Sequence, residues 1–292
     1  MSWTINFIKE TDFRHHVAKT IEAYGKKLLS YDLEKFNSNL IDPVKMIFDK
    51  NVYNESWEEL VKSEIFRQRD KASNNDIGYF HQRIFQYIKG CRVPDNGKEG
   101  GWDIIYENPD GIELPDGVTV HKIYVEMKNK HNTMNSAAST RTYMKMQNQL
   151  LHDDDCACFL VEVIAKCSQN VKWSTTIEGN KMGHKQIRRV SIDQFYGLVT
   201  GEEDAFHQIC LVLPHTIKKV IADGKEAKVP QDTAYLELKA IAQKAGGDDE
   251  ELALAMAMYM LGFSTYIGFQ DGEESSLKGI YQYLREHRAE YV

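Results

Sequence analysis

The 292-residue chain has little of what marks a secreted or membrane protein. It contains five cysteines, an odd number without the spacing of a disulfide framework, which favours a reducing compartment. No apolar run approaches the roughly 20 residues of a membrane span, and no apolar segment follows a basic N-terminus. We therefore expect a cytoplasmic protein with no membrane partner.

Positive charge is also in deficit, because 36 Lys and Arg residues oppose 43 Asp and Glu residues, giving a net charge of -7. This balance excludes a protein that coats nucleic acid through its bulk charge. DNA binding would need a local basic surface on an acidic remainder. We find no internal repeat, low-complexity tract or phosphate-binding P-loop, and the hydrophobic fraction of 42% is ordinary for a globular protein.

The most informative residues lie on two short expected strands. Asp103 precedes an apolar run, 104–106, that follows a glycine turn, and Glu126 and Lys128 lie within a second apolar run, 123–128. Side chains alternate along a strand, so Glu126 and Lys128 should point to the same face. If the two strands are neighbours, Asp103 can lie beside Glu126 and Lys128. Two carboxylates beside an ammonium group would form an oxygen-rich site for a divalent cation such as Mg²⁺.

This region resembles a known family through two stretches, Gly100-Gly101-Trp102-Asp103 and Glu126-Met127-Lys128-Asn129-Lys130-His131-Asn132-Thr133. They are similar to the PD-(D/E)xK nuclease superfamily and, within it, to type II restriction endonucleases of the group that cuts GGNCC-type sites. The proline that usually precedes the first aspartate is absent, since Trp102 stands there. The resemblance implies that Asp103, Glu126 and Lys128 are catalytic, and that Asp103, Glu126 and the Met127 carbonyl bind Mg²⁺.

The same resemblance implies an α/β fold, with a nuclease-like mixed sheet flanked by helices and with helical additions at both ends. It implies Mg²⁺-dependent double-strand cleavage of DNA at a short palindromic site, leaving a 5′-phosphate and a 3′-hydroxyl. Cutting both strands requires two copies of the site, so we expect a homodimer. A companion DNA methyltransferase acting on the same site is the partner expected beside double-stranded DNA.

Helical patterns dominate both ends of the chain. We expect a mainly helical region over residues 1–90, a catalytic α/β core over 91–222 and a helical region over 223–292, packed together as one compact unit. In the core, residues 156–165 are continuously apolar except for Glu162, which predicts a central strand covered on both faces. The last region shows three helical patterns, at 234–245, 248–261 and 275–287.

Capping and turn residues suggest where elements begin and end. A capping box at 56–59 should open a helix, and the polar run 73–76 should separate it from a second helix. That second helix carries Gln82, a candidate for lining the active site. Two turns, at 108–111 and 115–117, should both reverse the chain between the catalytic strands.

Two segments are candidates for DNA contact. After the second catalytic strand, a polar loop leads to a helix whose positive N-terminal end would lie near the metal site. Segment 166–189 is the most basic part of the chain. A plain N-cap loop and a solvated hairpin are the respective alternatives. The candidate DNA-contacting residues are Lys130, Asn132, Asn135, Ser136, Ser139, Arg141, Lys181, His184, Lys185 and Arg188.

Three other interpretations remain open. The Glu/Lys pair could belong to an exposed edge strand without function. A structure-specific DNA repair nuclease would share the same catalytic residues, but the basic hairpin and the polar loop favour readout of bases. A non-catalytic DNA-binding module is a further alternative, and it has no use for two carboxylates that face phosphate.

Overall fold

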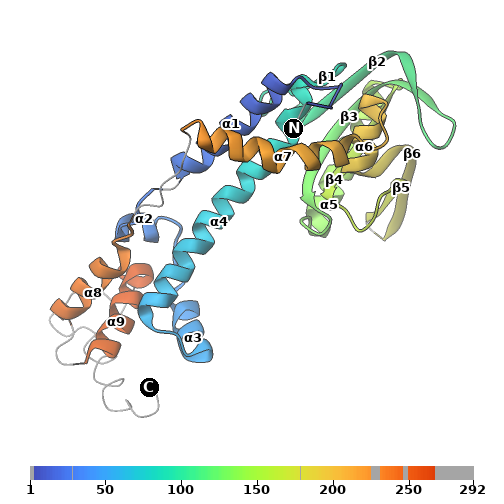
Figure 1. Cartoon of the computed structure of the whole chain (residues 1–292). Helices are drawn as coiled ribbons and strands as arrows, with labels where there is room; N and C mark the ends of the chain where they lie inside the picture. Colours follow the sequence, from blue (N-terminus) through green and yellow to red (C-terminus); the bar gives the residue numbers. More distant parts are fainter. Residues whose placement is uncertain (1–2, 28, 178, 225–230, 246–248, 267–292) are drawn as a thin grey trace. The chain divides into compact units, whose positions relative to one another are not determined.

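The computed structural model describes residues 3–27, 29–177, 179–224, 231–245 and 249–266, and the chain forms two compact units (Figure 1). One unit takes Met1–Ala23 and Asn75–Glu226, and the other takes Tyr24–Asn74 and Ala227–Val292. Each unit is therefore built from two separate stretches of the chain. Among the described residues, no helix combines the length and the apolarity needed to cross a bilayer.

The first unit contains a six-stranded sheet with helices on both sides. Its strands are β1 (Cys91–Arg92), β2 (Ile104–Glu113), β3 (Thr119–Lys130), β4 (Cys156–Ile164), β5 (Asn170–Ile177) and β6 (Asn180–Ser191). Its helical elements are α1 (Glu10–Lys27) as far as Ala23, the end of α4 (Trp57–Arg83), η1 (Ile84–Tyr87), η2 (Glu99–Gly101), α5 (Ser136–His152), α6 (Ile192–Thr200) and α7 (Ala205–Ala222).

The sheet is mixed and has the order β1-β2-β3-β4-β6-β5. The pairs β3–β4 and β4–β6 are parallel, and the other three pairs are antiparallel. Strand β4 lies in the middle and is buried along most of its length, as strands covered on both faces are. These features confirm the predicted α/β fold with a mixed sheet flanked by helices and the predicted central strand.

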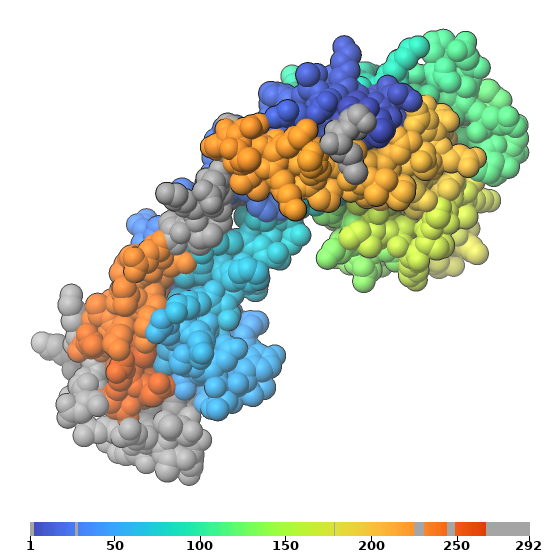
Figure 2. Space-filling view, in the orientation of Figure 1, coloured from blue at the N-terminus to red at the C-terminus, as the bar shows by residue number. Residues whose placement is uncertain are grey.

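Two apolar clusters fill the space on either side of this sheet. On one face, Val125 and Met127 of β3 belong to a cluster that includes Phe13 of α1, Phe195 of α6 and Ile209 of α7. On the other face, Ile105 and Leu160 pack with Tyr143 and Met146 of α5. Helices α1 and α7 lie side by side, and Arg14 pairs with Asp223 at 2.7 Å (Figures 1 and 2). Strands β2 and β3 are thus held from both faces.

The second unit is helical. It contains α2 (Leu33–Asn37), α3 (Pro43–Tyr53), the first part of α4, α8 (Ala234–Ala245) and α9 (Glu250–Phe263), which share one buried apolar cluster. The guanidinium group of Arg69 donates to both carboxylate oxygens of Asp232, at 2.9 and 2.6 Å. The helices predicted near 234–245 and 248–261 are confirmed, and the pattern at 275–287 lies outside the described residues.

Two predicted breaks were wrong. Helix α4 continues through 73–76, because polar residues lower helix propensity by only a few tenths of a kcal/mol each, and a long helix propagates across them. The run 108–111 does not reverse the chain but lies within β2, where the register with β3 shifts between Glu107 and Ile112. The Asn108 side chain stabilises this irregularity by donating to the Gly111 carbonyl at 3.0 Å. Only the second turn closes the hairpin.

Candidate active site

The candidate active site lies at the end of the β2–β3 hairpin opposite its turn. Gly100 and Gly101 have φ of 74° and 69°, a left-handed conformation that glycine adopts without strain, and they lead the chain into β2. Ile104 pairs with Val125, and the Asp103 N–H donates to the Val125 carbonyl at 2.9 Å. The two strands are therefore neighbours, and Asp103 lies beside Glu126 and Lys128 as the sequence predicts.

The Asp103 carboxylate is fixed by the backbone of the neighbouring strand. Its Oδ2 accepts a hydrogen bond of 2.7 Å from the Met127 N–H. In a strand, the N–H and C=O of one residue point to the same edge, so the Met127 carbonyl also faces the β2 side. The Met127 side chain is buried in the core on the opposite face from Glu126 and Lys128. The Met127 backbone can thus offer a third oxygen beside the two carboxylates.

Glu126 is held between two lysines. Lys128 donates to its Oε1 at 2.8 Å, and Lys145 of α5 donates to its Oε2 at 2.9 Å. Lys145 also donates to the Gly101 carbonyl at 2.7 Å, and its Nζ lies 4.0 Å from the centroid of the Trp102 ring. One lysine therefore connects Glu126 to the turn that precedes Asp103.

Sequence reasoning missed Lys145. The residue lies next to the buried Met146 on an amphipathic helix, a position where lysine is common as a surface residue. Its distance from the motif, with β3 and a loop in between, gives no short-range signal. The useful signal is spatial, because an ammonium group over an aromatic ring and against a carboxylate indicates a specific placement.

The electrostatics of the two carboxylates differ. Burial raises the pKa of Asp103 to about 6, since desolvation and the nearby Glu126 charge outweigh the Met127 hydrogen bond and the two lysines. Burial also disfavours ionised Glu126, but the charges and hydrogen bonds of Lys128 and Lys145 outweigh it and lower the pKa of Glu126. The site therefore holds one firmly ionised carboxylate beside another that a nearby cation would help to ionise.

This donor set fits a hard divalent cation. Carboxylate and carbonyl oxygens are the ligands that Mg²⁺ prefers, and Mg²⁺ is commonly held by one or two carboxylates together with substrate phosphate. Within the described part of the chain, no group of three or more His, Cys, Asp or Glu side chains is arranged to hold a metal. Asp103, Glu126 and the Met127 carbonyl would therefore leave further coordination positions to water and substrate.

Two hollows flank these residues. A cavity of about 480 Å³ reaches Asp103 and is lined by Gln82 and by two cationic side chains, Lys19 and Arg83. On the other side, a hollow of about 340 Å³ is lined by Lys128 and Arg141. Gln82, the candidate for lining the site, thus shares one cavity with Asp103, and Lys128 borders a second hollow.

The predicted DNA-contacting residues fall into two groups in the structure. The loop after β3 leads into α5, and the Asn135 side chain caps this helix by accepting from the Ala138 N–H at 2.9 Å. The β5–β6 hairpin forms the second group. The exposed members are Lys130, Asn132, Asn135, Ser136, Arg141, Lys181, His184 and Lys185, and Ser139 is half-buried.

Arg188 differs from the other predicted DNA contacts because only 2% of it is exposed. Its guanidinium group donates to Asp116 at 2.7 Å and to the side chain and carbonyl of Asn170, at 2.6 and 2.7 Å. These bonds tie the base of the hairpin to the turn between β2 and β3. The burial of Arg188 favours a structural role over a DNA contact.

We therefore expect Arg188→Ala to destabilise the protein, whereas Lys185→Ala, an exposed control on the same strand, should leave stability unchanged. Loss of a buried charge partner costs about 3–5 kcal/mol, and the partial exposure of Asp116 should reduce this to roughly 2–3 kcal/mol. Denaturant unfolding measures both variants. Equal unfolding free energies for Arg188→Ala and wild type would contradict this role.

Residues 5–222 match a family model described as Eco47II restriction endonuclease. The type II restriction enzyme Sau96I of Staphylococcus aureus is 28% identical over 274 residues, which cover 91% of this chain and 98% of that enzyme. The type II restriction enzyme Eco47II of Escherichia coli is 27% identical over 228 residues, covering 75% of this chain and 89% of that enzyme.

Proposed function

Because the chain belongs to the Eco47II restriction endonuclease family, we propose that it is a type II restriction enzyme that cuts both strands of DNA at a short palindromic site, in a Mg²⁺-dependent reaction. The relatives named as type II restriction enzymes, which align with most of the chain, support the enzyme class. The observation that supports the proposed mechanism is that Asp103, Glu126 and Lys128 lie together at the open end of one hairpin. The motif resemblance supports a site of the GGNCC type.

The reaction is hydrolysis of a phosphodiester. A water oxygen forms a bond to phosphorus, the bond from phosphorus to the 3′-oxygen breaks, and the products are a 5′-phosphate and a protonated 3′-hydroxyl. Mg²⁺, when bound by Asp103, Glu126 and the Met127 carbonyl, would polarise the phosphate and lower the pKa of the attacking water. Lys128 lies beside these ligands, where its ammonium group can hold that water and offset the negative charge that develops on the phosphoryl oxygens.

Other residues of the chain position these groups. The Met127 N–H keeps one Asp103 oxygen in a fixed direction, and Lys145 holds Glu126 against the Gly101 turn. The low pKa of Glu126, which the two lysines produce against its burial, keeps that carboxylate charged at neutral pH. The site is thus largely formed before substrate arrives, which lowers the cost of reorganisation.

DNA recognition is assigned to the exposed polar and basic residues of the loop after β3, the start of α5 and the β5–β6 hairpin. Their charges oppose the acidic average of the chain, as a local DNA-binding surface requires. One chain carries one set of catalytic residues, so a two-fold homodimer would cut both strands of a palindrome. A DNA methyltransferase that modifies the same site would protect the host DNA.

Lys145→Met should lower the cleavage rate by roughly tenfold to a hundredfold, equivalent to about 1.4–2.8 kcal/mol of barrier. The variant keeps the length of the side chain but loses the charge that fixes Glu126. Its affinity for uncut DNA in EDTA should change little. Single-turnover cleavage measures the rate, with Lys145→Arg as the charge-retaining control that should recover part of it. A wild-type rate in Lys145→Met would show that Lys145 does not position Glu126 for the reaction.

Digestion of phage DNA by purified protein, with Mg²⁺ or with EDTA, tests the proposed function. Discrete bands that require Mg²⁺ are expected, and the ends of the fragments give the recognition sequence and the position of the cut. A smear would favour a structure-specific or non-specific nuclease. Intact DNA under both conditions would contradict the proposal.

A further inference from the structure

A buried carboxylate, Glu162, lies outside the proposed chemistry. It belongs to the central strand β4, and 0% of it is exposed. Burial of a carboxylate is costly unless the charge is paired and fully hydrogen-bonded. An apolar residue at this position would avoid the cost, so the contacts of Glu162 indicate what the charge is used for.

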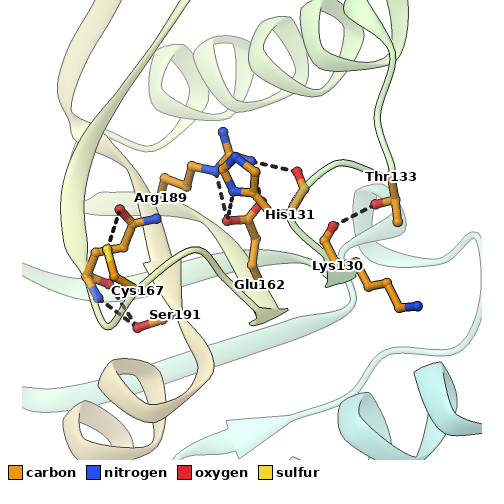
Figure 3. Close-up of polar contacts among 8 residues, drawn as sticks. Lys130, His131, Thr133, Glu162, Cys167, Arg189 and Ser191 are labelled. Carbon is orange, nitrogen blue, oxygen red and sulfur yellow. Dashed lines mark hydrogen bonds and ion pairs between the residues drawn. The ribbon is translucent and has the colours of Figure 1, made fainter.

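Glu162 connects two other segments of the chain (Figure 3). Arg189 of β6 donates to both carboxylate oxygens, through Nε at 2.9 Å and through Nη2, which is a bidentate ion pair. His131, the first residue after β3, has its Nδ1 3.0 Å from Oε2 of Glu162, and Nδ1 is the donor because a carboxylate only accepts. Nη2 of Arg189 also donates to the His131 carbonyl at 2.9 Å, which closes the network.

The network lies directly beside the candidate active site. Glu162 pairs with Lys128 in the parallel register of β3 and β4, and side chains at paired positions project from the same face of a sheet. His131 follows Lys128 by three residues, and its N–H donates to the Ile164 carbonyl at 3.0 Å. The position at which the chain leaves β3 is therefore set by groups on β4 and β6.

Both segments that Glu162 joins carry candidate DNA contacts. The loop from His131 to Asn135 presents Asn132 and leads into α5, and Thr133 within it donates to the Lys130 carbonyl at 3.0 Å (Figure 3). Strand β6 presents Lys181 on the same hairpin whose base contains Arg189. One carboxylate thus connects the polar loop to the base of the basic hairpin.

We propose that Glu162 is a positioning residue for DNA recognition, which holds the loop His131–Asn135 and the β5–β6 hairpin in the arrangement that reads the site. This inference rests on the proposed function and deepens it. A purely structural ion pair would affect the stability of the folded protein without changing the affinity of the molecules that remain folded. Affinity for site DNA therefore separates the two roles.

The test compares variants in a titration of a fluorescent duplex that carries the site mapped from the phage digest, in EDTA, with a scrambled duplex as reference. His131→Ala removes the loop's contact with Glu162, and His131→Asn retains an N–H donor close to the position of Nδ1. His121→Ala is the matched control, because His121 makes a similar 2.8 Å contact with Asp155 at the other end of β3. Glu162→Gln changes the other member of the same contact, because it removes the carboxylate charge and keeps the size of the side chain.

We expect His131→Ala to bind site DNA roughly tenfold or more weakly, a change of about 1.4 kcal/mol, with little change for the scrambled duplex. His131→Asn should recover most of the loss, and His121→Ala should bind like wild type. If His131→Ala melts cooperatively and binds site DNA with wild-type affinity, the inference is overturned. Wild-type protein without preference for the site would overturn the proposed function as well, so the two failures are distinguishable.

Discussion

Replacing Lys128 by alanine is expected to lower the rate of DNA cleavage by about a thousandfold or more, in the range of losses seen when a charge-stabilising or proton-transferring group is removed. Lys128 donates to Glu126 at 2.8 Å and is partly exposed to the hollow in which substrate would lie. Its ammonium group would offset charge that grows only as the reaction proceeds. Binding of uncut DNA should therefore remain within a few-fold of wild type.

The matched control for this variant is Lys122→Ala. Lys122 lies on the same strand and also pairs with a glutamate, Glu107, at 3.3 Å, but it lies six residues before Lys128 in the sequence. Exposed pairs of this kind contribute only about 0–1 kcal/mol, so stability should change little. Single-turnover rates and anisotropy titrations in EDTA measure both variants. A Lys128→Ala protein that cuts at the wild-type rate would remove Lys128 from the mechanism.

Asp103→Asn should also abolish cleavage, because it removes one of the two carboxylates available to a cation. The asparagine oxygen can still accept from the Met127 N–H, so the fold should be retained. DNA binding in EDTA should be unchanged or tighter, since a negative charge that faces phosphate has been removed. Detectable Mg²⁺-dependent cleavage near the wild-type rate would contradict the assignment of Asp103.

The same variant gives a pH test that does not depend on activity. Burial raises the pKa of Asp103 from 3.8 to about 6, so the folded state binds this proton more tightly than the unfolded chain does. The free energy of unfolding must then decrease as pH rises from about 3.8 to about 6. The stabilisation that comes from protonated Asp103 is fully present only below this interval. Without divalent cations, Asp103→Asn should gain stability relative to wild type as pH rises from about 4 to about 7. A difference in melting temperature that stays constant with pH would show that the pKa of Asp103 is not raised.

Short-range sequence patterns were sufficient to predict the two strands that position Asp103, Glu126 and Lys128. The alternation in β3 correctly predicted that Glu126 and Lys128 share a face and that Met127 points to the other, since a strand has a fixed period of two. The glycine turn before Asp103 and the reversal at 115–117 brought the two strands together as expected. Their roles in catalysis stay predictions, because geometry alone does not test them.

Long-range pairing could not be predicted in the same way. Arg188 and Lys185 look alike in the sequence, yet only the first meets Asp116, 72 positions away, and becomes buried. Likewise, residues 24–74 pack with the helices after 230 because their apolar faces match in space, and periodicity does not identify a partner. Lys145 was missed for the same reason, since its significance comes from Glu126 and Gly101.

The location of the divalent cation tests the central claim most directly. Crystals of the protein soaked in Mn²⁺, a scatterer that can replace Mg²⁺ at oxygen ligands, would give an anomalous difference map. The account predicts a peak bound by Asp103, Glu126 and the Met127 carbonyl, and predicts that it disappears in Asp103→Asn. A strong peak elsewhere in the chain, with none at these three residues, would contradict the assignment of the active site.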